Sequence, residues 1–431
     1  MSTSYLSRSV TASTNTSYTV SMWIKFTRTS VPSGSPYMWS CGANGSGAQG
    51  LYMNSSDMKL SYYGHSGYSS YTLSDGSLRD YSGWYHIVWS VNAGTGTCYI
   101  NGVQQGSTFS GIAPLNAHGG TAMALNTYVG TGYTTYDDLA PLMSHVHFID
   151  GTAYPATTFG ETDSVTGEWK IKTDVSVNYG TNGFFLFKDN ASVNDQSGNG
   201  NNFTATGSVT QTEDNPSNVF PVLNQLNAQA SGYTFDGLGS LSVTGNTGDA
   251  WRTMYATFGA SSGKYYWEQK ITNFTGTDPH YIGIVSDDQM TNTNYDSSLA
   301  SRGYFYTATG DKRNNNTQTS YGNSWTTNDI VGIALDLDNS KIFFSKNGVW
   351  QNSGDPANGT NPAFTITSGY TYIPATSTYY NLNRYDMNFG NGAFGSTQLT
   401  GTTYQGSGNI GIFKYQPPTG FTALSTKGLN E

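Results

Sequence analysis

The stretch Asp329-Ile-Val-Gly-Ile-Ala-Leu-Asp-Leu-Asp338, followed by Ile342-Phe-Phe-Ser-Lys-Asn-Gly348, decides the fold class. It contains two short apolar runs separated by a polar turn, a pattern typical of paired strands. The second run closes on Asn347-Gly348, a dipeptide that accepts the positive φ values of a two-residue hairpin turn. The spacing therefore predicts antiparallel strands over 330–337 and 341–345.

A second hairpin of the same kind lies in the first half of the chain. Residues 84–91 form an apolar run, which turns through 92–96 and returns over 97–100 before Asn101-Gly102. Only a short helical turn is expected, near 155–159. The sequence predicts an all-β protein with two antiparallel β-sandwich (jelly-roll) domains. Four more runs have strand character, at 18–27, 142–149, 264–271 and 281–285.

Length and charge exclude several classes of protein. The chain has 431 residues, enough for two or three domains, and a net charge of -9. Only 11% of residues are charged, and the clustered Lys and Arg that bind nucleic acid are missing, so no nucleic-acid partner is expected. No apolar stretch of about 18 residues occurs, so no membrane insertion is expected. Met1–Val10 lacks the apolar segment of a signal peptide, so secretion by that route is not expected.

Composition also suggests where the domains meet. Residues 189–230 are rich in Asn, Ser, Thr, Gly and Asp, which predicts a polar linker between a domain over 1–188 and a domain over 231–431. The two cysteines, Cys41 and Cys98, are too few for a disulfide framework. Two buried free thiols are favoured over a disulfide between them.

Three short segments of the first half carry a family resemblance. Residues 18–26, Trp84-Tyr-His-Ile-Val88 and Tyr99-Ile-Asn-Gly-Val103 resemble the opening strand, the Trp-x-His strand and the hairpin of laminin-G-like, concanavalin A-like jelly rolls. Residues 145–161 and 179–202 are similar to segments of bacteriophage structural proteins. The resemblance implies a jelly-roll domain that binds a ligand without altering it.

The second half resembles a SPRY domain. The resemblance is carried by Tyr265-Tyr-Trp-Glu268, Tyr281-Ile-Gly-Ile-Val285, Gly310-Asp-Lys312 and the stretch quoted above. Asn328 stands where the family usually has Gly, a departure that affects a turn and leaves the sandwich intact. The resemblance again implies a binding module, and fold alone does not settle function.

Candidate ligand-binding residues follow from the chemistry of sugars, whose apolar faces stack on exposed aromatic rings. The Tyr- and Gly-rich segment 62–71 suits this role, and an ordinary strand pair at a sandwich edge is the equal alternative. In the SPRY half the resemblance implies binding by loops at one end, although Tyr304 and Tyr306 alternate to one face and several of these aromatic residues must be core. The candidates are Tyr63, Tyr68, Tyr71, Tyr295, Arg302, Tyr321 and Trp325.

Two segments are candidates for calcium. Asp195-Gln-Ser-Gly-Asn-Gly200 places oxygen ligands at alternate positions, but Thr206 stands where the bidentate Glu is expected, which favours a polar turn. The resemblance to jelly rolls that bind calcium through acidic loops implies a second candidate, the adjacent pair Asp137-Asp138. The candidate ligands are Asp137, Asp138, Asp195 and Asn199, and no other cofactor is expected. His145 and His147 lie two apart on one strand, where packed imidazoles are favoured over a metal site.

No catalytic residues are assigned, so the chain is expected not to be an enzyme. A retaining glycosidase needs two carboxylates about 5 to 5.5 Å apart. The nearest motif is Glu161-Thr-Asp163, which has Thr166 where the second Glu belongs. Residues 45–50 match a dinucleotide-binding fingerprint, but no helix follows, so a flexible loop is predicted.

These observations favour a surface protein of a bacteriophage virion, a fibre or decoration component that binds a host-surface glycan or a neighbouring virion protein. The expected partners are other virion proteins and host-surface polysaccharide. A homo-oligomer is expected, and the phage context suggests a trimer. The expected location is the assembled virion, after synthesis in the host cytoplasm. A purely architectural virion component is the main alternative, and a polysaccharide-degrading enzyme is the third.

Overall fold

The structure is a computed structural model that describes residues 4–11, 13–27, 34–43, 47–119, 121–129, 139, 141–188, 192–226, 232–245, 250–275, 280–290, 300–379 and 382–430. These residues form β-strands and short 3₁₀ turns, without an α-helix among them, so the all-β prediction is confirmed. Over the same residues, no helical segment reaches the length and hydropathy that a membrane crossing requires. The chain divides into two units, Met1–Thr210 and Gln211–Glu431.

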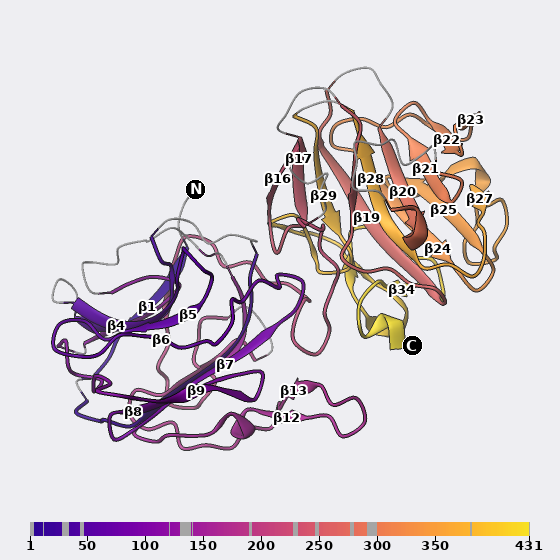
Figure 1. Ribbon diagram of the computed structural model, residues 1–431. Helices are drawn as coiled ribbons and strands as arrows, with labels where there is room; N and C mark the ends of the chain where they lie inside the picture. Colours follow the sequence, from indigo (N-terminus) through magenta and orange to yellow (C-terminus); the bar gives the residue numbers. More distant parts are fainter. Residues whose placement is uncertain are drawn as a thin grey trace. The chain divides into compact units, whose positions relative to one another are not determined.

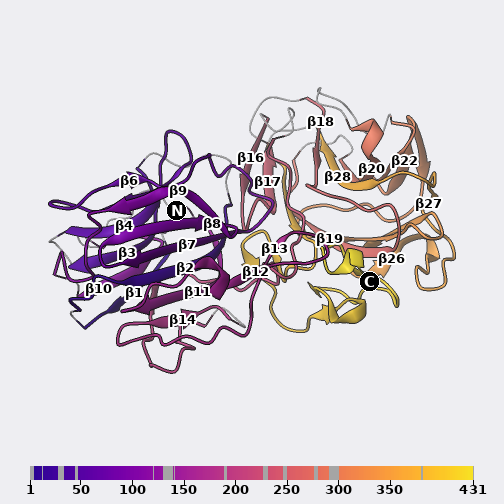
Figure 2. The ribbon, with the colours of Figure 1, turned by 60° about the horizontal axis from the view of Figure 1, so that its bottom comes forward.

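The first unit is a sandwich of two antiparallel sheets, whose strands run side by side in Figure 2. The seven-stranded sheet has the order β15 (Thr204–Thr206), β1 (Tyr5–Ser9), β10 (Ala122–Leu125), β3 (Tyr37–Ala43), β4 (Gly47–Met53), β5 (Leu60–Tyr63), β6 (Tyr71–Thr72). The six-stranded sheet has the order β14 (Phe184–Leu186), β11 (Leu142–Asp150), β2 (Tyr18–Lys25), β7 (Tyr85–Asn92), β8 (Thr95–Ile100), β9 (Val103–Ser110). The predicted runs at 84–91, 97–100 and 142–149 are all strands.

Strand β2 is buried on both faces, whereas the alternation of apolar and polar residues over 18–27 predicts a half-buried strand. Tyr18, Val20 and the alternate residues that follow them face the core between the sheets. The other face is covered by residues 151–180, which include η1 (Ala156–Thr158) and the hairpin β12 (Gly160–Thr162) and β13 (Trp169–Ile171). Thr19 bonds this cover directly, because its hydroxyl donates to the carbonyl of Thr152 and accepts from the N–H of Tyr154.

The segment 189–230, predicted as a linker, contributes to both units instead. Its β15 pairs with β1 of the first unit, and the division between the units falls at 210/211. Further on, the N–H of Glu213 donates to Asn391 and the N–H of Leu223 donates to Ser240 of the second unit. Polar composition indicated few buried apolar residues there, but Asn and Asp side chains that bond backbone can hold such a segment in place.

The second unit is also a sandwich of two sheets, labelled in Figure 1. One sheet has the order β16 (Tyr233–Asp236), β17 (Ser242–Gly245), β29 (Arg384–Asn388), β19 (Lys264–Asn273), β24 (Ile330–Asp336), β25 (Lys341–Lys346), β26 (Val349–Trp350), with β27 (Phe364–Thr365) on β25 and β34 (Thr422–Ala423) on β19. The other has the order β18 (Arg252–Tyr255), β28 (Tyr372–Thr378), β20 (Tyr281–Ser286), β21 (Gly303–Thr307), β22 (Asp311–Asn314), β23 (Thr317–Ser320). Short elements complete the unit: η3 (Asp287–Gln289), η5 (Gln351–Ser353), β30 (Ala393–Phe394), β31 (Thr397–Gln398), β32 (Tyr404–Gln405), η6 (Ser407–Asn409), β33 (Ile412–Phe413) and η7 (Gly428–Asn430).

The two predicted Asn-Gly hairpins share one set of hydrogen bonds. In the second unit, Asn347 accepts the N–H of Ile330 through its side chain and donates its own N–H to the Ile330 carbonyl, at 2.8 and 2.7 Å. In the first unit, Asn101 makes the same two bonds with His86, at 2.8 and 2.9 Å. Asn328, which replaces the usual Gly before the long strand, has φ of 72°. Asn tolerates this left-handed conformation, so the turn is kept.

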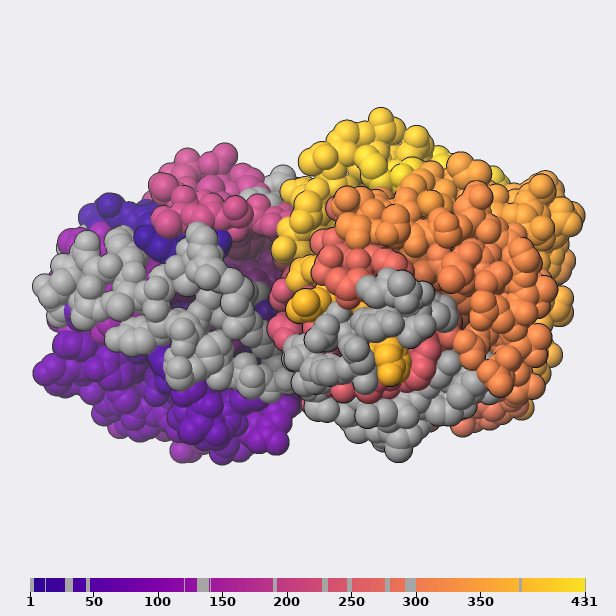
Figure 3. All heavy atoms as spheres, turned by 90° about the horizontal axis from the view of Figure 1, so that it is seen from above, coloured from indigo at the N-terminus to yellow at the C-terminus, as the bar shows by residue number. Residues whose placement is uncertain are grey.

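The C-terminal segment is bonded to the second unit by a buried carboxylate. Figure 3 shows the yellow, C-terminal part of the chain lying against the orange part of that unit. Glu268 of β19 is fully buried and accepts the N–H groups of Lys414 and Tyr415 at 2.9 and 2.7 Å. It also accepts the side chains of Asn388 and Tyr266, at 3.1 Å each. Burial raises the pKa of Glu268 to about 7, although all four bonds act in the opposite direction.

Candidate functional site

The outer face of the seven-stranded sheet, which points away from the core of the first sandwich, carries small residues. Met123 and Leu125 of β10 face the core, so their neighbours Ala122 and Ala124 face outward. Ala48 of β4 belongs to the same outer cluster. Small side chains leave room for large rings to lie on the sheet.

Rings follow one another from this face in an unbroken series of contacts, which we call the tyrosine–histidine band. The centroids of neighbouring rings are 4.7 to 6.3 Å apart. Contacts of this kind stabilise by about 0.5–1.5 kcal/mol each beyond burial, so the series holds its members in fixed positions. In order, the band consists of Tyr52, Tyr37, Tyr128, Tyr63, His65, His118 and Tyr68.

Two glycines allow rings of the band to lie close to the backbone. A Cβ atom on Gly50 would lie 2.7 Å from Cδ1 of Tyr37. A Cβ atom on Gly47 would lie 2.5 Å from Cε1 of His65, and Gly47 has φ of 99°, a conformation that L side chains rarely adopt. Each position therefore requires the absence of a side chain.

The accessible end of the band consists of Tyr63, His65, His118 and Tyr68. Tyr63 and His65 meet edge to face at 5.8 Å, and the two imidazoles meet at 4.8 Å. The Tyr68 ring stands perpendicular to His118 at 5.7 Å and is 38% exposed. Tyr37 and Tyr128, further along the band, are buried. A ligand would therefore meet the Tyr68 end first.

Hydrogen bonds fix the loop that carries Tyr68. Its N–H donates to the carbonyl of His65 at 3.0 Å, and the next residue, Ser69, donates to Gly111 at 3.2 Å. The N–H of Gly64 donates to Ser70 Oγ at 3.1 Å. His118 Nε2 donates to the carbonyl of Gly64 at 2.9 Å, which joins the two loops. Fixed aromatic and hydrogen-bonding groups at an exposed position can stack on a sugar and bond its hydroxyls.

The three tyrosines predicted in segment 62–71 separate into two groups. Tyr63 and Tyr68 both belong to the band. Tyr71 lies in the edge strand β6, where its ring packs on Phe109 at 5.0 Å and its hydroxyl donates to the Ser110 carbonyl at 2.7 Å. Tyr71 is therefore part of an ordinary strand edge, whereas Tyr63 and Tyr68 remain candidates for ligand binding.

The predicted residues of the second unit lie in different environments. Arg302 pairs with Asp288, and its guanidinium carbon lies 4.3 Å from the centre of the Tyr370 ring. Tyr321 and Trp325 are buried in the core, so the prediction that they present rings to a ligand is corrected. Both residues follow β23, outside any strand, so strand alternation gives no information about where their rings point. Tyr295 lies outside the described residues.

A second aromatic group, which the sequence analysis did not identify, lies in the second unit. Trp251 stacks on Tyr281 at 4.9 Å with 9° between the rings, and it meets Tyr379 at 5.6 Å. The guanidinium of Arg313 lies 5.1 Å from the Tyr281 ring centre. Leu382, at the turn between β28 and β29, is 58% exposed with φ of 63°. Trp251, Tyr281, Arg313 and Tyr379 come from separate segments of the sequence and follow no period, which is why the sequence pattern did not reveal the group.

The predicted calcium loop is a hydrogen-bonded turn. Asp195 Oδ1 accepts the N–H groups of Phe185 and Ser197, both at 2.9 Å. Its Oδ2 accepts the hydroxyl of Ser197 at 2.8 Å and the N–H of Asn201 at 2.9 Å. Four donors occupy the acceptor sites of this carboxylate, which leaves none for a cation.

Asn199, the other candidate ligand among the described residues, is also held by backbone bonds. Asn199 uses its amide N–H₂ to donate to the carbonyls of Gly180 and Gly183. Asp137 and Asp138 lie outside the described residues. In the part of the chain that is described, no three His, Cys, Asp or Glu side chains come together in a group that could hold a metal.

His145 and His147 pack in the first sandwich. A bulge between Ser144 and His147 interrupts β11, and His145 has φ of 45°. Both imidazoles contact Phe185, at 5.6 and 4.0 Å. Nδ1 of His147 bonds the hydroxyl of Tyr179 at 2.8 Å. These contacts are those of packed imidazoles.

The two carboxylates of the acidic motif at β12 share one lysine. Lys170 lies 3.4 Å from Glu161 and 3.2 Å from Asp163, on an exposed hairpin. The N–H groups of Thr166 and Val165, followed by Lys170, lower the pKa of Asp163 to about 2. A carboxyl group with such a low pKa is already ionised near neutral pH, so it cannot act as a general acid there.

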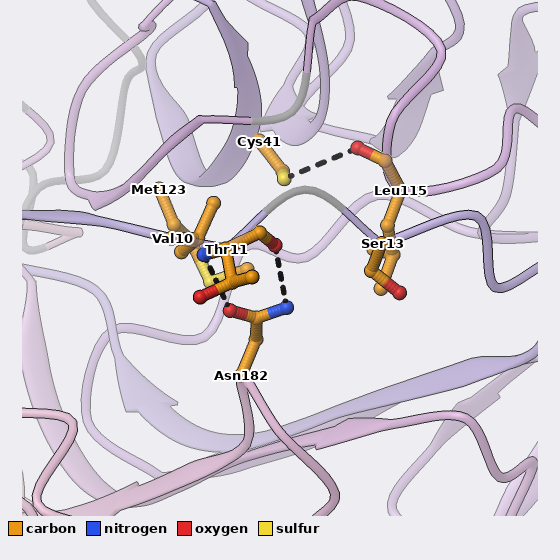
Figure 4. A pocket seen from close by; sticks show the side chains of 7 residues that line it. All are labelled: Val10, Thr11, Ser13, Cys41, Leu115, Met123 and Asn182. Atoms are coloured by element: carbon orange, nitrogen blue, oxygen red, sulfur yellow. Dashed lines mark hydrogen bonds between the residues drawn. The ribbon is translucent and has the colours of Figure 1, made fainter.

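A small depression in the first unit contains one of the two cysteines, as Figure 4 shows. Asn182 crosses it, accepting the Thr11 N–H and donating to the Thr11 carbonyl, at 2.9 Å each. No room is left for a water-sized molecule. Cys41 is a free thiol, as is Cys98, and burial raises the pKa of Cys41 to about 12. Such a thiol is not a nucleophile.

Models of two known families match segments of the chain, one in each unit. The model of the concanavalin A-like lectin/glucanases superfamily matches residues 1–156, and the SPRY domain model matches residues 264–392. The chain is 32% identical over 99 residues to ATP-dependent RNA helicase DDX1 of Xenopus laevis, which is 23% of this chain and 12% of the helicase. It is 29% identical over 182 residues to ATP-dependent RNA helicase Ddx1 of Drosophila melanogaster, 41% of this chain and 20% of the helicase. The chain thus spans a small part of these relatives.

Solved structures give distant likenesses. The SPRY domain of human HERC1 is 22% identical, with a TM-score of 0.27, over 34% of this chain and 86% of that one. The heptameric SAP-like pentraxin from Limulus polyphemus is 17% identical, with a TM-score of 0.28, over 36% of this chain and 72% of that one. Likenesses at these scores carry no functional information.

Proposed function

We propose that this chain, which combines a concanavalin A-like domain with a SPRY domain, is a non-catalytic binding protein on the surface of a bacteriophage virion. In this proposal it is a fibre or decoration component, and its first sandwich binds a glycan of the host surface. The second sandwich binds a neighbouring virion protein, and the assembled component is a homo-oligomer.

The observation that supports glycan binding is the accessible end of the tyrosine–histidine band. Tyr68 is exposed, yet its ring is fixed against His118 and its backbone against His65. A fixed ring loses little conformational entropy when a ligand stacks on it. The hydroxyls of Tyr63 and Tyr68 and the nearby serines can bond sugar hydroxyls, and none of these groups is a catalytic acid or base.

The virion assignment depends on the phage-like segments of the first half and on the low charge of the chain. The alternative, a purely architectural virion component, is favoured by one observation in the second unit. Leu382 is exposed and held in a left-handed conformation, because its N–H donates to Gly245 and its carbonyl accepts Asn273 Nδ2. An apolar side chain fixed in this way suits a protein–protein contact.

A glycan array, followed by adsorption blocking, tests the proposal. The purified chain should bind host-surface glycans on the array, and an excess of it should block adsorption of the phage that encodes it. Reducing sugar should not increase when the chain is incubated with the bound polysaccharide. Failure to bind any glycan would contradict the proposal and leave the architectural role, whereas release of reducing sugar would show an enzyme.

A further inference from the structure

The accessible end of the band is uncharged. Its four side chains contact one another and neutral backbone groups; they are those of Tyr63, His65, Tyr68 and His118. None of them forms an ion pair or a cation–π contact with a described residue. Among the described residues of β3 and β4, Gly47 lies against the His65 ring and Ala43 lies against Gly119, and neither residue titrates. A carboxylate on a ligand would therefore leave water without meeting a fixed positive charge, which is unfavourable.

The imidazole of His118 is held in its neutral form by its surroundings. Its Nε2 donates to the Gly64 carbonyl, so Nδ1 carries the lone pair of the neutral ring. The titratable groups that face it are His65 and Tyr68, both from the loop after β5. Burial and then His65 lower the pKa of His118, while the Gly64 carbonyl acts in the opposite direction. Among the described residues, no carboxylate opposes this lowering.

We propose that the band takes a neutral glycan, without carboxylate or sulfate groups, and releases it when His118 gains a proton. The inference rests on the proposed function and deepens it by naming the class of glycan and the condition of release. A sugar that covers Tyr68 and His118 removes the ring of His118 from water. Covering a neutral imidazole costs little, whereas covering an imidazolium costs much more.

Linkage then sets the direction of the pH dependence. A ligand that binds only the neutral form loses affinity by about tenfold for each pH unit below the pKa of His118. Above that pKa the affinity is constant. An acidic glycan would show the reverse slope, because a protonated imidazole would attract its carboxylate.

The experiment compares two oligosaccharides of the same length and linkage, one neutral and one with uronic acid units, by isothermal titration from pH 8 to pH 5. The full chain is compared with His118→Gln, which can still donate to the Gly64 carbonyl but cannot titrate. The matched control is Tyr71→Phe, in the same segment but outside the band. We expect the neutral sugar to bind the native chain tighter at pH 8 and to lose about tenfold per unit in acid, while His118→Gln shows a flat profile.

A second readout does not depend on a variant. NMR titration of His118 with and without saturating neutral sugar should show its pKa fall on binding. Tighter binding of the uronic sugar, affinity that rises in acid, or an unchanged pKa of His118 would overturn this inference while leaving glycan binding intact. Absence of binding to either sugar at pH 8 would overturn the proposed function, and the inference with it.

Discussion

Trp169 donates its indole N–H to Nδ1 of His86 across 2.9 Å, and this bond sets the tautomer of a fully buried imidazole. Because Nδ1 accepts, Nε2 carries the proton and donates to Ser21 Oγ at 2.9 Å. The Ser–His pair thus has the spacing of a nucleophile and its base, but the proton points the wrong way. Burial also lowers the pKa of His86 to about 3. The pair lies on the sheet face that residues 151–180 cover, and it is not arranged for nucleophilic catalysis.

Replacing Trp169 by Phe should destabilise the first unit. The change leaves a buried acceptor nitrogen of His86 without its donor, which costs about 1–3 kcal/mol. It also reduces the ring that lies over Gly102, where a Cβ would lie 2.4 Å from the indole. Urea unfolding should show the loss. Val165→Ala, at the 90% exposed tip of the same hairpin, is the control and should stay within about 0.5 kcal/mol. Equal midpoints for the two variants would mean that the hydrogen bond contributes nothing.

Glu268 should make the second unit less stable as the pH rises. Its pKa is about 7 in the folded chain against an ordinary value of 4.5, so between these values the folded state holds a proton that the unfolded state has released. Between pH 4.5 and 7 this group should therefore lower stability by about 1.4 kcal/mol per unit.

The variant Glu268→Gln isolates that effect. It cannot ionise, so its stability should change less than that of the native chain between pH 5 and 7. It should also expose the C-terminal segment to proteases near Lys414. In one orientation the amide N–H₂ of the new Gln would face the donors of Lys414 and Asn388, and in the other those of Tyr415 and Tyr266. The same pH slope in both proteins would show that Glu268 is ionised throughout this range.

Two glycines offer a matched test of the band. Gly47 and Gly67 have φ of 99° and 88°, so Ala strains the backbone at both. A Cβ on Gly47 would strike the His65 ring, whereas one on Gly67 would meet nothing within 4 Å. Gly47→Ala should therefore lose glycan binding, and Gly67→Ala should keep it despite a similar loss of thermal stability. Equal binding by both would place the ligand elsewhere.

The fold was predictable because its signals are local. Asn101-Gly102 and Asn347-Gly348 each specify a turn within two residues. The side chain of each Asn also accepts a backbone N–H from the strand before it, that of His86 or Ile330. The band was only partly predictable. Tyr63 and Tyr68 lie in one Tyr- and Gly-rich segment, but His118 comes from a distant loop with no periodic pattern. The requirement for Gly47 arises only when the His65 ring is placed above it.

The burial of some loop side chains could not be assigned from sequence for a related reason. The sequence suggests Tyr321 and Trp325 as ligand-binding loop residues, but their rings pack around Tyr306, at 5.5 and 6.5 Å. Both lie between β23 and β24, outside any strand, so no period in the sequence shows which way their rings turn. Likewise, residues 151–180 cover β2, which no period within β2 could reveal.

The most direct test is the affinity of Tyr68→Ala for a glycan that the native chain binds. The backbone bonds of Tyr68 do not involve its ring, so the variant should fold, with a loss of stability of about 0.5–1.5 kcal/mol from the missing His118 contact. Loss of one stacking ring should weaken binding by about tenfold or more, since such contacts contribute about 0.5–1.5 kcal/mol beyond their buried area. Titration calorimetry that returns the native affinity for a correctly folded Tyr68→Ala would contradict binding at the tyrosine–histidine band.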